Sequence, residues 1–161
     1  MTKRAVYLET SVVGYATSRP NRDLVVAGHQ QITREWFALR AHGYELFVSQ
    51  LVVSEASGGE EEAARERAAF LQGILRLGIT DAAGELAAKL VESGAVPRKA
   101  AEDALHIAVA AVHGVDYLLT WNCKHIANAV MRQAIEGVCR EAGYEPPVIC
   151  RPEDPMGDER G

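Results

Sequence analysis

The chain has 161 residues, a formal net charge of −5, and a composition that is 48% hydrophobic and 24% charged. This length suits one domain with a sizeable core. The acidic balance excludes a protein that coats nucleic acid through bulk positive charge, but it is compatible with an enzyme that gathers acidic residues around a metal. The cysteines, Cys123, Cys139 and Cys150, lack ligand-type spacing, so we expect them to be reduced.

No early segment has the pattern of a signal peptide, because Glu9 interrupts the only apolar run near the start. The later apolar run at 107–112 is far shorter than the roughly 20 residues that a membrane span needs. The sequence therefore predicts a cytoplasmic protein with no membrane contact.

The first predicted unit is a strand at Ala5–Leu8, followed by a short helix that starts near Thr10 or Ser11. Glu9 lies between them, at the carboxyl end of the strand. An acid there can simply be a helix-start residue favoured by the macrodipole, and its position alone leaves that reading open. A longer helix, about 22–40, begins after Pro20, and its apolar spacing predicts core positions at Leu24, Ala27, Ile32, Trp36 and Leu39.

The second unit is a strand at Glu45–Val48 and a short helix, Gln50–Ser57, that we expect Ser49 to cap. Glu55 shares the helix stripe of Leu51 and Val52, so it is predicted to point inward. An inward carboxylate is costly unless a cation meets it, and that cation can be an arginine or a metal ion. A helix from Glu60, a half-buried or edge strand at 74–79, and a helix from Asp81 to about Ser93 follow.

The stretch 98–128 is predicted to be a nearly all-apolar helix, a glycine turn, and a buried strand at Tyr117–Leu119 with a polar exit at Asn122. Asp103 lies in the opening turns of that helix. His106 follows three residues later and flanks the same face. We expect His106 to pack or to orient a neighbour rather than to act as a general base, because a metal-bound water needs no such base.

A helix at about 128–141 and a last strand at Val148–Cys150 complete the pattern. Residues 1–150 are predicted to form the domain, and the polar tail 151–161 is predicted to be flexible. Recurring strand–helix units indicate an α/β protein, a three-layer α/β/α sandwich with a central, mostly parallel sheet of about five short strands.

Four residues are candidates for one site at the carboxyl ends of the strands: Glu9, Glu55, Asp103 and Asn122. Converging carboxylates repel one another unless one takes up a proton or a cation joins them. Oxygen ligands favour Mg²⁺ or Mn²⁺. Such an ion can promote hydrolysis of a phosphodiester bond.

The segments YLETSV, VSE, EDALHIAVAA and DYLLTWN, in this order and spacing, resemble the PIN-domain family. More narrowly, the chain is similar to VapC-like toxins of bacterial toxin–antitoxin pairs, over residues 4 to about 150. The resemblance implies a Mg²⁺- or Mn²⁺-dependent endoribonuclease that acts on RNA, is silenced by a separate antitoxin and forms a homodimer.

Carried over by motif, the resemblance makes Glu9, Glu55, Asp103 and Asn122 the catalytic residues. Of these, Glu9 and Asp103 are expected to be the chief metal ligands, with Glu55 and Asn122 holding water or substrate. Thr10, Ser11 and Thr120 match the small hydroxyl residues beside the site and are expected to bind substrate. Lys124 and His125 follow Asn122 and are candidates to meet the substrate backbone, although an ordinary surface pair is an equal reading.

This chain departs from the family at two positions, since the family usually has Asp in place of Glu9 and often has Asp in place of Asn122. Glu reaches one methylene farther, and Asn keeps a carbonyl ligand but loses a charge. The alternative is therefore a weakened or inactive PIN-like module that binds RNA or a protein partner. An unrelated α/β phosphatase or nucleotide binder is disfavoured, because the sequence has no glycine-rich phosphate loop. Trp121 is expected to be buried rather than to stack on a base.

Overall fold

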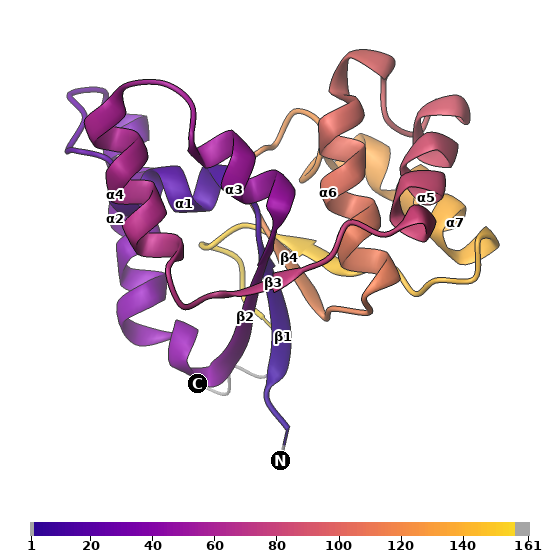
Figure 1. Cartoon of the computed structure of the whole chain (residues 1–161), viewed down its shortest axis with the longest axis horizontal. Coiled ribbons are helices and arrows are strands. Elements are labelled where there is room, and N and C mark those ends of the chain that lie inside the picture. Colours follow the sequence, from indigo (N-terminus) through magenta and orange to yellow (C-terminus); the bar gives the residue numbers. More distant parts are fainter. Residues whose placement is uncertain (1, 157–161) are drawn as a thin grey trace.

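The computed structural model describes residues 2–156, in which strands alternate with helices along the chain (Figure 1). The strands are β1 (Arg4–Leu8), β2 (Tyr44–Ser49), β3 (Leu75–Leu77), β4 (Tyr117–Leu119) and β5 (Val148–Cys150). The α-helices are α1 (Thr10–Thr17), α2 (Leu24–Leu39), α3 (Gln50–Ala56), α4 (Glu61–Leu71), α5 (Asp81–Glu92), α6 (Ala101–Val112) and α7 (Ala129–Glu141). Short 3₁₀ turns at Ala41–Gly43 and Arg98–Ala100 precede β2 and α6.

All strands join one sheet in the order β3-β2-β1-β4-β5, and every neighbouring pair is parallel. Tyr7 of β1 is therefore flanked by Phe47 of β2 and Leu118 of β4. The chain builds outward from β1 to β3 and then crosses to the other side of β1 to add β4 and β5. Strand order thus reverses between β1 and β4. In open α/β sheets, ligands bind outside the carboxyl ends of the strands at such a switch point.

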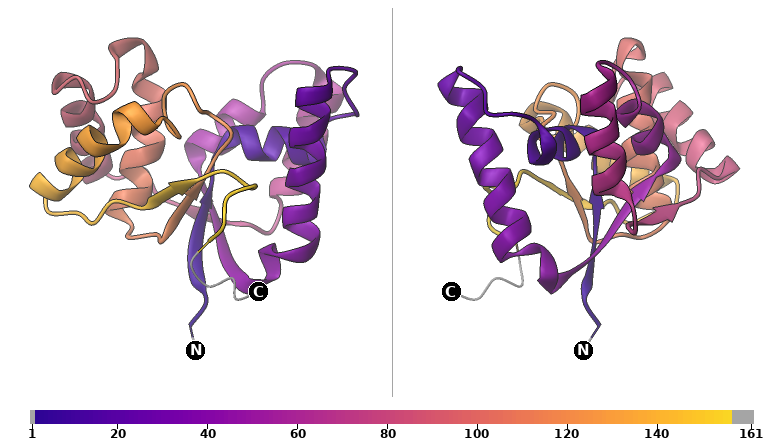
Figure 2. Two further views of the ribbon diagram at one scale, coloured as in Figure 1. Left: turned by 180° about the vertical axis from the view of Figure 1, so that it is seen from behind. Right: turned by 60° about the vertical axis from the view of Figure 1, so that its left-hand side comes forward.

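Helices α1–α4 lie on one side of the sheet and α5–α7 on the other (Figures 1 and 2). The predicted three-layer α/β/α sandwich is confirmed, and the sheet is parallel throughout. Strand β1 is covered on both faces, so Val6, Tyr7 and Leu8 are fully buried in sequence. This burial explains a continuous apolar run where a half-exposed strand would alternate.

The predicted core of α2 is correct in its middle and wrong at its ends. Trp36 is 1% exposed, whereas Leu24 is 87% and Leu39 is 69% exposed. The helix begins at Leu24 itself, where the Asp23 carboxylate caps it by accepting from the N–H groups of Val25 and Val26. Terminal turns extend past the surface that the helix covers, so an apolar residue there can face water despite its correct spacing.

The tail departs from its predicted flexibility over residues 151–156. The guanidinium group of Arg40 donates to the carbonyl oxygens of Pro152 (2.9 Å) and Asp154 (3.1 Å). Pro152 and Met156 are buried. These residues pack on the domain, and the remainder of the predicted tail, 157–161, lies outside the described residues. Within residues 2–156, no helix combines the length and the apolar character that crossing a membrane requires.

Candidate active site

Glu9 follows β1 at the switch point. Its N–H donates to the Leu119 carbonyl (3.1 Å), so pairing with β4 continues one residue beyond β1 and fixes the Glu9 backbone. The residue is only 5% exposed. Its Oε1 atom accepts hydrogen bonds from the hydroxyls of Ser11 (2.5 Å) and Thr120 (2.6 Å). Its other oxygen, Oε2, accepts none from any residue that the structure describes, so it is the oxygen that can bind a ligand.

Glu55 reaches the same region from α3, the helix that directly follows β2. Its Oε1 atom accepts from the Thr10 hydroxyl (2.5 Å) and lies 2.7 Å from Nε2 of His106. Partial burial alone raises the pKa of Glu55. The hydrogen bonds from His106 and Thr10 outweigh burial and hold the pKa below its ordinary value. Glu55 is therefore an ionised carboxylate at neutral pH. Its contacts with Thr10 and His106 agree with the inward direction that the helix face of Leu51 and Val52 predicted.

Sequence reasoning missed Glu102. Its side chain hydrogen-bonds to Glu55, and this contact with a second acid raises the pKa of Glu102. Glu102 lies four residues before His106 on α6, so the two side chains share a helix face. The four-residue spacing of Glu102 and His106 was the signal that the sequence offered. The family motif, however, matches Asp103, one residue later.

Asp103 and Asn122 both contact His125, which lies in the turn after β4. The Asp103 carboxylate lies 3.2 Å from Nδ1 of His125. The Asn122 side-chain oxygen accepts from the backbone N–H of His125 (3.0 Å) and so closes the turn after β4. Lys124 is exposed, and its carbonyl accepts from the Asn128 amide (2.8 Å). Contacts of Lys124 and His125 with a substrate stay predictions.

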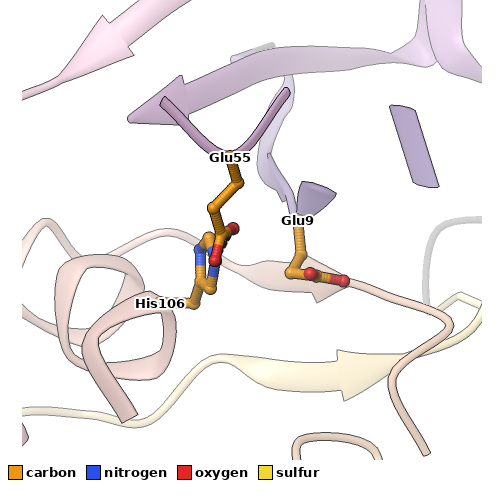
Figure 3. Close-up of side chains that lie close together, drawn as sticks. All are labelled: Glu9, Glu55 and His106. Carbon is orange, nitrogen blue, oxygen red and sulfur yellow. Dashed lines mark hydrogen bonds and ion pairs between the residues drawn. The ribbon is translucent and has the colours of Figure 1, made fainter. Parts of the chain in front are cut away.

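The side chains of Glu9, Glu55 and His106 lie close together (Figure 3). One potential ligand atom of each lies within 4.8 Å of the others. Two carboxylates at this spacing repel by about 3 kcal/mol at an effective dielectric of about 20. Their oxygen atoms suit a hard cation such as Mg²⁺ or Mn²⁺, which would remove the repulsion. Asp103 is not a member of this close group among the described residues, and the expectation that Glu9 and Asp103 are the chief metal ligands stays a prediction.

Trp121, directly after Thr120, is 8% exposed, and its predicted burial is confirmed. Its ring stacks on His29 with a centroid separation of 4.0 Å, and its Nε1–H donates to the Thr33 hydroxyl (2.7 Å). The backbone N–H of Trp121 donates to the Ser11 hydroxyl (2.9 Å), the same hydroxyl that donates to Glu9. Trp121 thereby ties the end of β4 to α1 and α2 behind the acidic group.

The fold and site define a class: a parallel α/β/α sandwich with carboxylates gathered at its switch point. No protein-family model and no curated protein matches the sequence. The structure is similar to a chain of the crystal structure of VapBC2 from Rickettsia felis bound to a DNA fragment from their promoter, with a TM-score of 0.58, 15% sequence identity, and coverage of 91% of this chain and 98% of that chain. A likeness to VapBC-5 from Mycobacterium tuberculosis has a TM-score of 0.46, 19% identity, and coverage of 73% and 85%. The first likeness confirms that the chain has a VapC-like PIN-domain fold.

Proposed function

We propose that this protein is a Mg²⁺- or Mn²⁺-dependent endoribonuclease and the toxin of a toxin–antitoxin pair. The observation that carries the proposal is the buried Glu9 carboxylate, which lies close to Glu55 at the switch point of the sheet and has one oxygen with no hydrogen bond from the described residues. A buried acid without a cation is costly, so the burial of Glu9 favours a functional site over a helix-start role. The fold shared with a VapBC2 chain supports the same reading.

In this proposal Glu9 and Glu55 hold the cation. Asp103, in the first turn of α6, is the additional metal ligand that the sequence predicts. When bound, a divalent cation of this kind lowers the pKa of water and offsets charge that develops on a phosphate. The hydroxyl groups and the histidine beside these two carboxylates orient them. Ser11 and Thr120 fix one oxygen of Glu9, while Thr10 and His106 fix one oxygen of Glu55.

The three hydroxyls predicted to meet substrate, Thr10, Ser11 and Thr120, all direct their hydrogens to carboxylates. We propose that they act on substrate indirectly, by holding the acids in place. Lys124 is the exposed cation nearest in sequence to the site, and we assign it to the RNA backbone, where a basic group positions a strand without reading its bases.

A separate antitoxin, a homodimer and a cytoplasmic location complete the proposal. The antitoxin is proposed from the likeness to a chain of the VapBC2 crystal structure. Its test is genetic. Expression of the chain alone should stop growth, and co-expression of a small reading frame next to it should restore growth. Growth arrest by an equally expressed Glu9→Gln variant would contradict a toxic nuclease.

The enzymatic test is cleavage of a structured RNA by purified protein with Mn²⁺. Wild type should cut, and EDTA or Glu9→Gln should reduce cutting at least a hundredfold. Glu85→Gln makes the same change at an exposed position of α5 and should leave cutting intact. Equal cutting by wild type and Glu9→Gln would sink the nuclease assignment. Binding of RNA without cutting would favour the second candidate, a non-catalytic module. That candidate is considered because Asn122 has a neutral amide where the family often has an aspartate.

A further inference from the structure

Behind Glu55 lies a buried row of polar side chains, of which only His106 has been given a role above. The Tyr7 hydroxyl lies 2.7 Å from the Ser49 hydroxyl on one side and 2.7 Å from Nδ1 of His106 on the other. Nε2 of His106 lies 2.7 Å from Glu55. Ser49, Tyr7 and His106 are all 0% exposed. The row comes from the end of β2, the next-to-last residue of β1 and the centre of α6.

Ser49 departs from its predicted role. It occupies the N-cap position of α3, where serine usually accepts a hydrogen bond from a backbone N–H, yet it makes no side-chain cap. Its hydroxyl is turned to Tyr7 instead. A side-chain cap usually stabilises a helix, so the hydrogen bond to Tyr7 replaces a common source of helix stability.

The chemistry of each group fixes the direction of these hydrogen bonds. An ionised Glu55 can only accept, so Nε2 of His106 must carry a hydrogen. In the neutral ring, Nδ1 then has a lone pair and accepts from the Tyr7 hydroxyl. A tyrosine hydroxyl donates one hydrogen bond and can accept others, so the Tyr7 hydroxyl donates to Nδ1. The Tyr7 oxygen in turn accepts from Ser49.

We propose that Ser49 and Tyr7 are positioning residues that hold His106 with its Nε2–H directed at Glu55, so that His106 orients Glu55 and is not itself a ligand of the cation. The part concerning the cation rests on the proposed function, whereas the ring orientation does not. Although His106 lies as close to Glu9 and Glu55 as a ligand would, an Nε2 atom that carries hydrogen has no lone pair for a metal.

A purely structural row would stabilise the fold without controlling Glu55, and the two roles separate experimentally. Tyr7→Phe removes one oxygen atom and leaves the ring in place. We expect it to weaken Mn²⁺ binding about tenfold, the lower end of what loss of an orienting partner costs. Tyr44→Phe removes the hydroxyl of another buried tyrosine, at the amino end of β2, and should leave Mn²⁺ affinity unchanged even if it lowers the melting temperature.

The direct test is nitrogen–proton NMR of the histidine rings in the intact protein. His106 should show an Nε2–H signal without metal, and that signal should persist at saturating Mg²⁺. Tyr7→Phe should give mixed tautomers or a shifted Nδ1 resonance, and Ser49→Ala, the milder change, should shift Nδ1 in the same direction. An Nδ1–H tautomer, or loss of the Nε2–H signal on adding Mg²⁺, would overturn the proposal.

Failure of this inference is distinguishable from failure of the proposed function. If His106 shows the Nε2–H tautomer and Mn²⁺ binds through Glu9, but the protein cuts no RNA, the positioning role is supported and the nuclease function is contradicted. A protein that cuts RNA while His106 carries its hydrogen on Nδ1 retains the nuclease and loses the positioning row. Unchanged Mn²⁺ affinity in a folded Tyr7→Phe protein also counts against the positioning role.

Discussion

Nε2 of His106 and Oε1 of Glu55 lie 2.7 Å apart although 51 residues separate them in the chain. The contact joins α6, on one side of the sheet, to α3, on the other, at the carboxyl edge where the central strands end (Figure 1). Because α3 directly follows β2 and α6 lies over the centre of the sheet, the parallel topology itself brings the two side chains together. The acidic site therefore depends on the packing of both helix layers.

Glu9→Gln should abolish stabilisation by Mn²⁺. At a Mn²⁺ concentration a hundred times the dissociation constant, binding stabilises the folded state by about 2.7 kcal/mol, which corresponds to a rise in Tm of roughly 5–10 °C for a chain of this length. The amide keeps the shape of Glu9 but removes the charge that attracts the cation. Differential scanning fluorimetry with and without Mn²⁺ measures the effect, and Glu85→Gln is the matched control. A shift of wild-type size in Glu9→Gln would show that the cation binds elsewhere.

Asn122→Asp should raise the affinity for Mn²⁺ several-fold. Aspartate keeps the oxygen that accepts from the His125 N–H, so the turn after β4 is preserved while a charge is added beside the acids. The same added repulsion should lower the stability of the metal-free protein slightly. Isothermal titration calorimetry tests the first effect and urea denaturation the second.

Asn128→Asp is the control for that change. Asn128 also accepts backbone N–H groups through its side-chain oxygen, but at the start of α7. It should leave Mn²⁺ affinity unaltered. Equal gains from Asn122→Asp and Asn128→Asp would indicate a general charge effect and would remove Asn122 from the site.

Local patterns were sufficient to predict most of the fold. The buried strand at Tyr117–Leu119 and the last strand at Val148–Cys150 have the predicted bounds, because short apolar runs between turn residues leave few alternatives. The position of Glu9 at a strand end was also predictable, since an uninterrupted apolar run, Ala5–Leu8, precedes it. The predicted core positions at the two ends of α2 were wrong. The spacing of apolar residues shows which face of a helix is buried, but not how far along the helix the neighbouring elements extend.

The pairing of side chains across layers was not predictable. The stripe of α3 directs Glu55 inward, but only the approach of α6 determines that it meets His106 and Glu102. Ser49 shows the same limit, because its N-cap position predicts a backbone partner and only the proximity of Tyr7 supplies another. Motifs identify which residues matter, while the three-dimensional packing determines which of them touch.

Among the cysteines, Cys123 should be the one that reacts rapidly with a thiol reagent at pH 8. It is exposed, whereas Cys139 and Cys150 are buried. Burial raises the pKa of Cys139 to about 11, so it is almost entirely a protonated, unreactive thiol. Absorbance after addition of a disulfide reagent should show one fast thiol in native protein, none in Cys123→Ser, and all thiols in denaturant. More than one fast thiol in the native protein would contradict the burial of α7 and β5.

Asp154→Asn should destabilise the protein near pH 6 and lose its effect in acid. Partial burial raises the pKa of Asp154, but hydrogen bonds from the Arg151 guanidinium and backbone N–H outweigh it and leave the pKa below its ordinary value. A carboxyl group with a lowered native pKa stabilises the fold above its unfolded pKa, near 3.9, and the contribution disappears as pH falls through the lower native value.

The expected loss at pH 6 is below about 1 kcal/mol, because Arg151 is 41% exposed and solvent screens the pair. Urea denaturation of wild type and variant between pH 6 and pH 3 measures it. Their difference should shrink with acid, since protonation makes the wild-type side chain neutral like the amide. A difference that stays constant over this range would mean that Asp154 acts through shape alone and that charge does not hold residues 151–156 against Arg40.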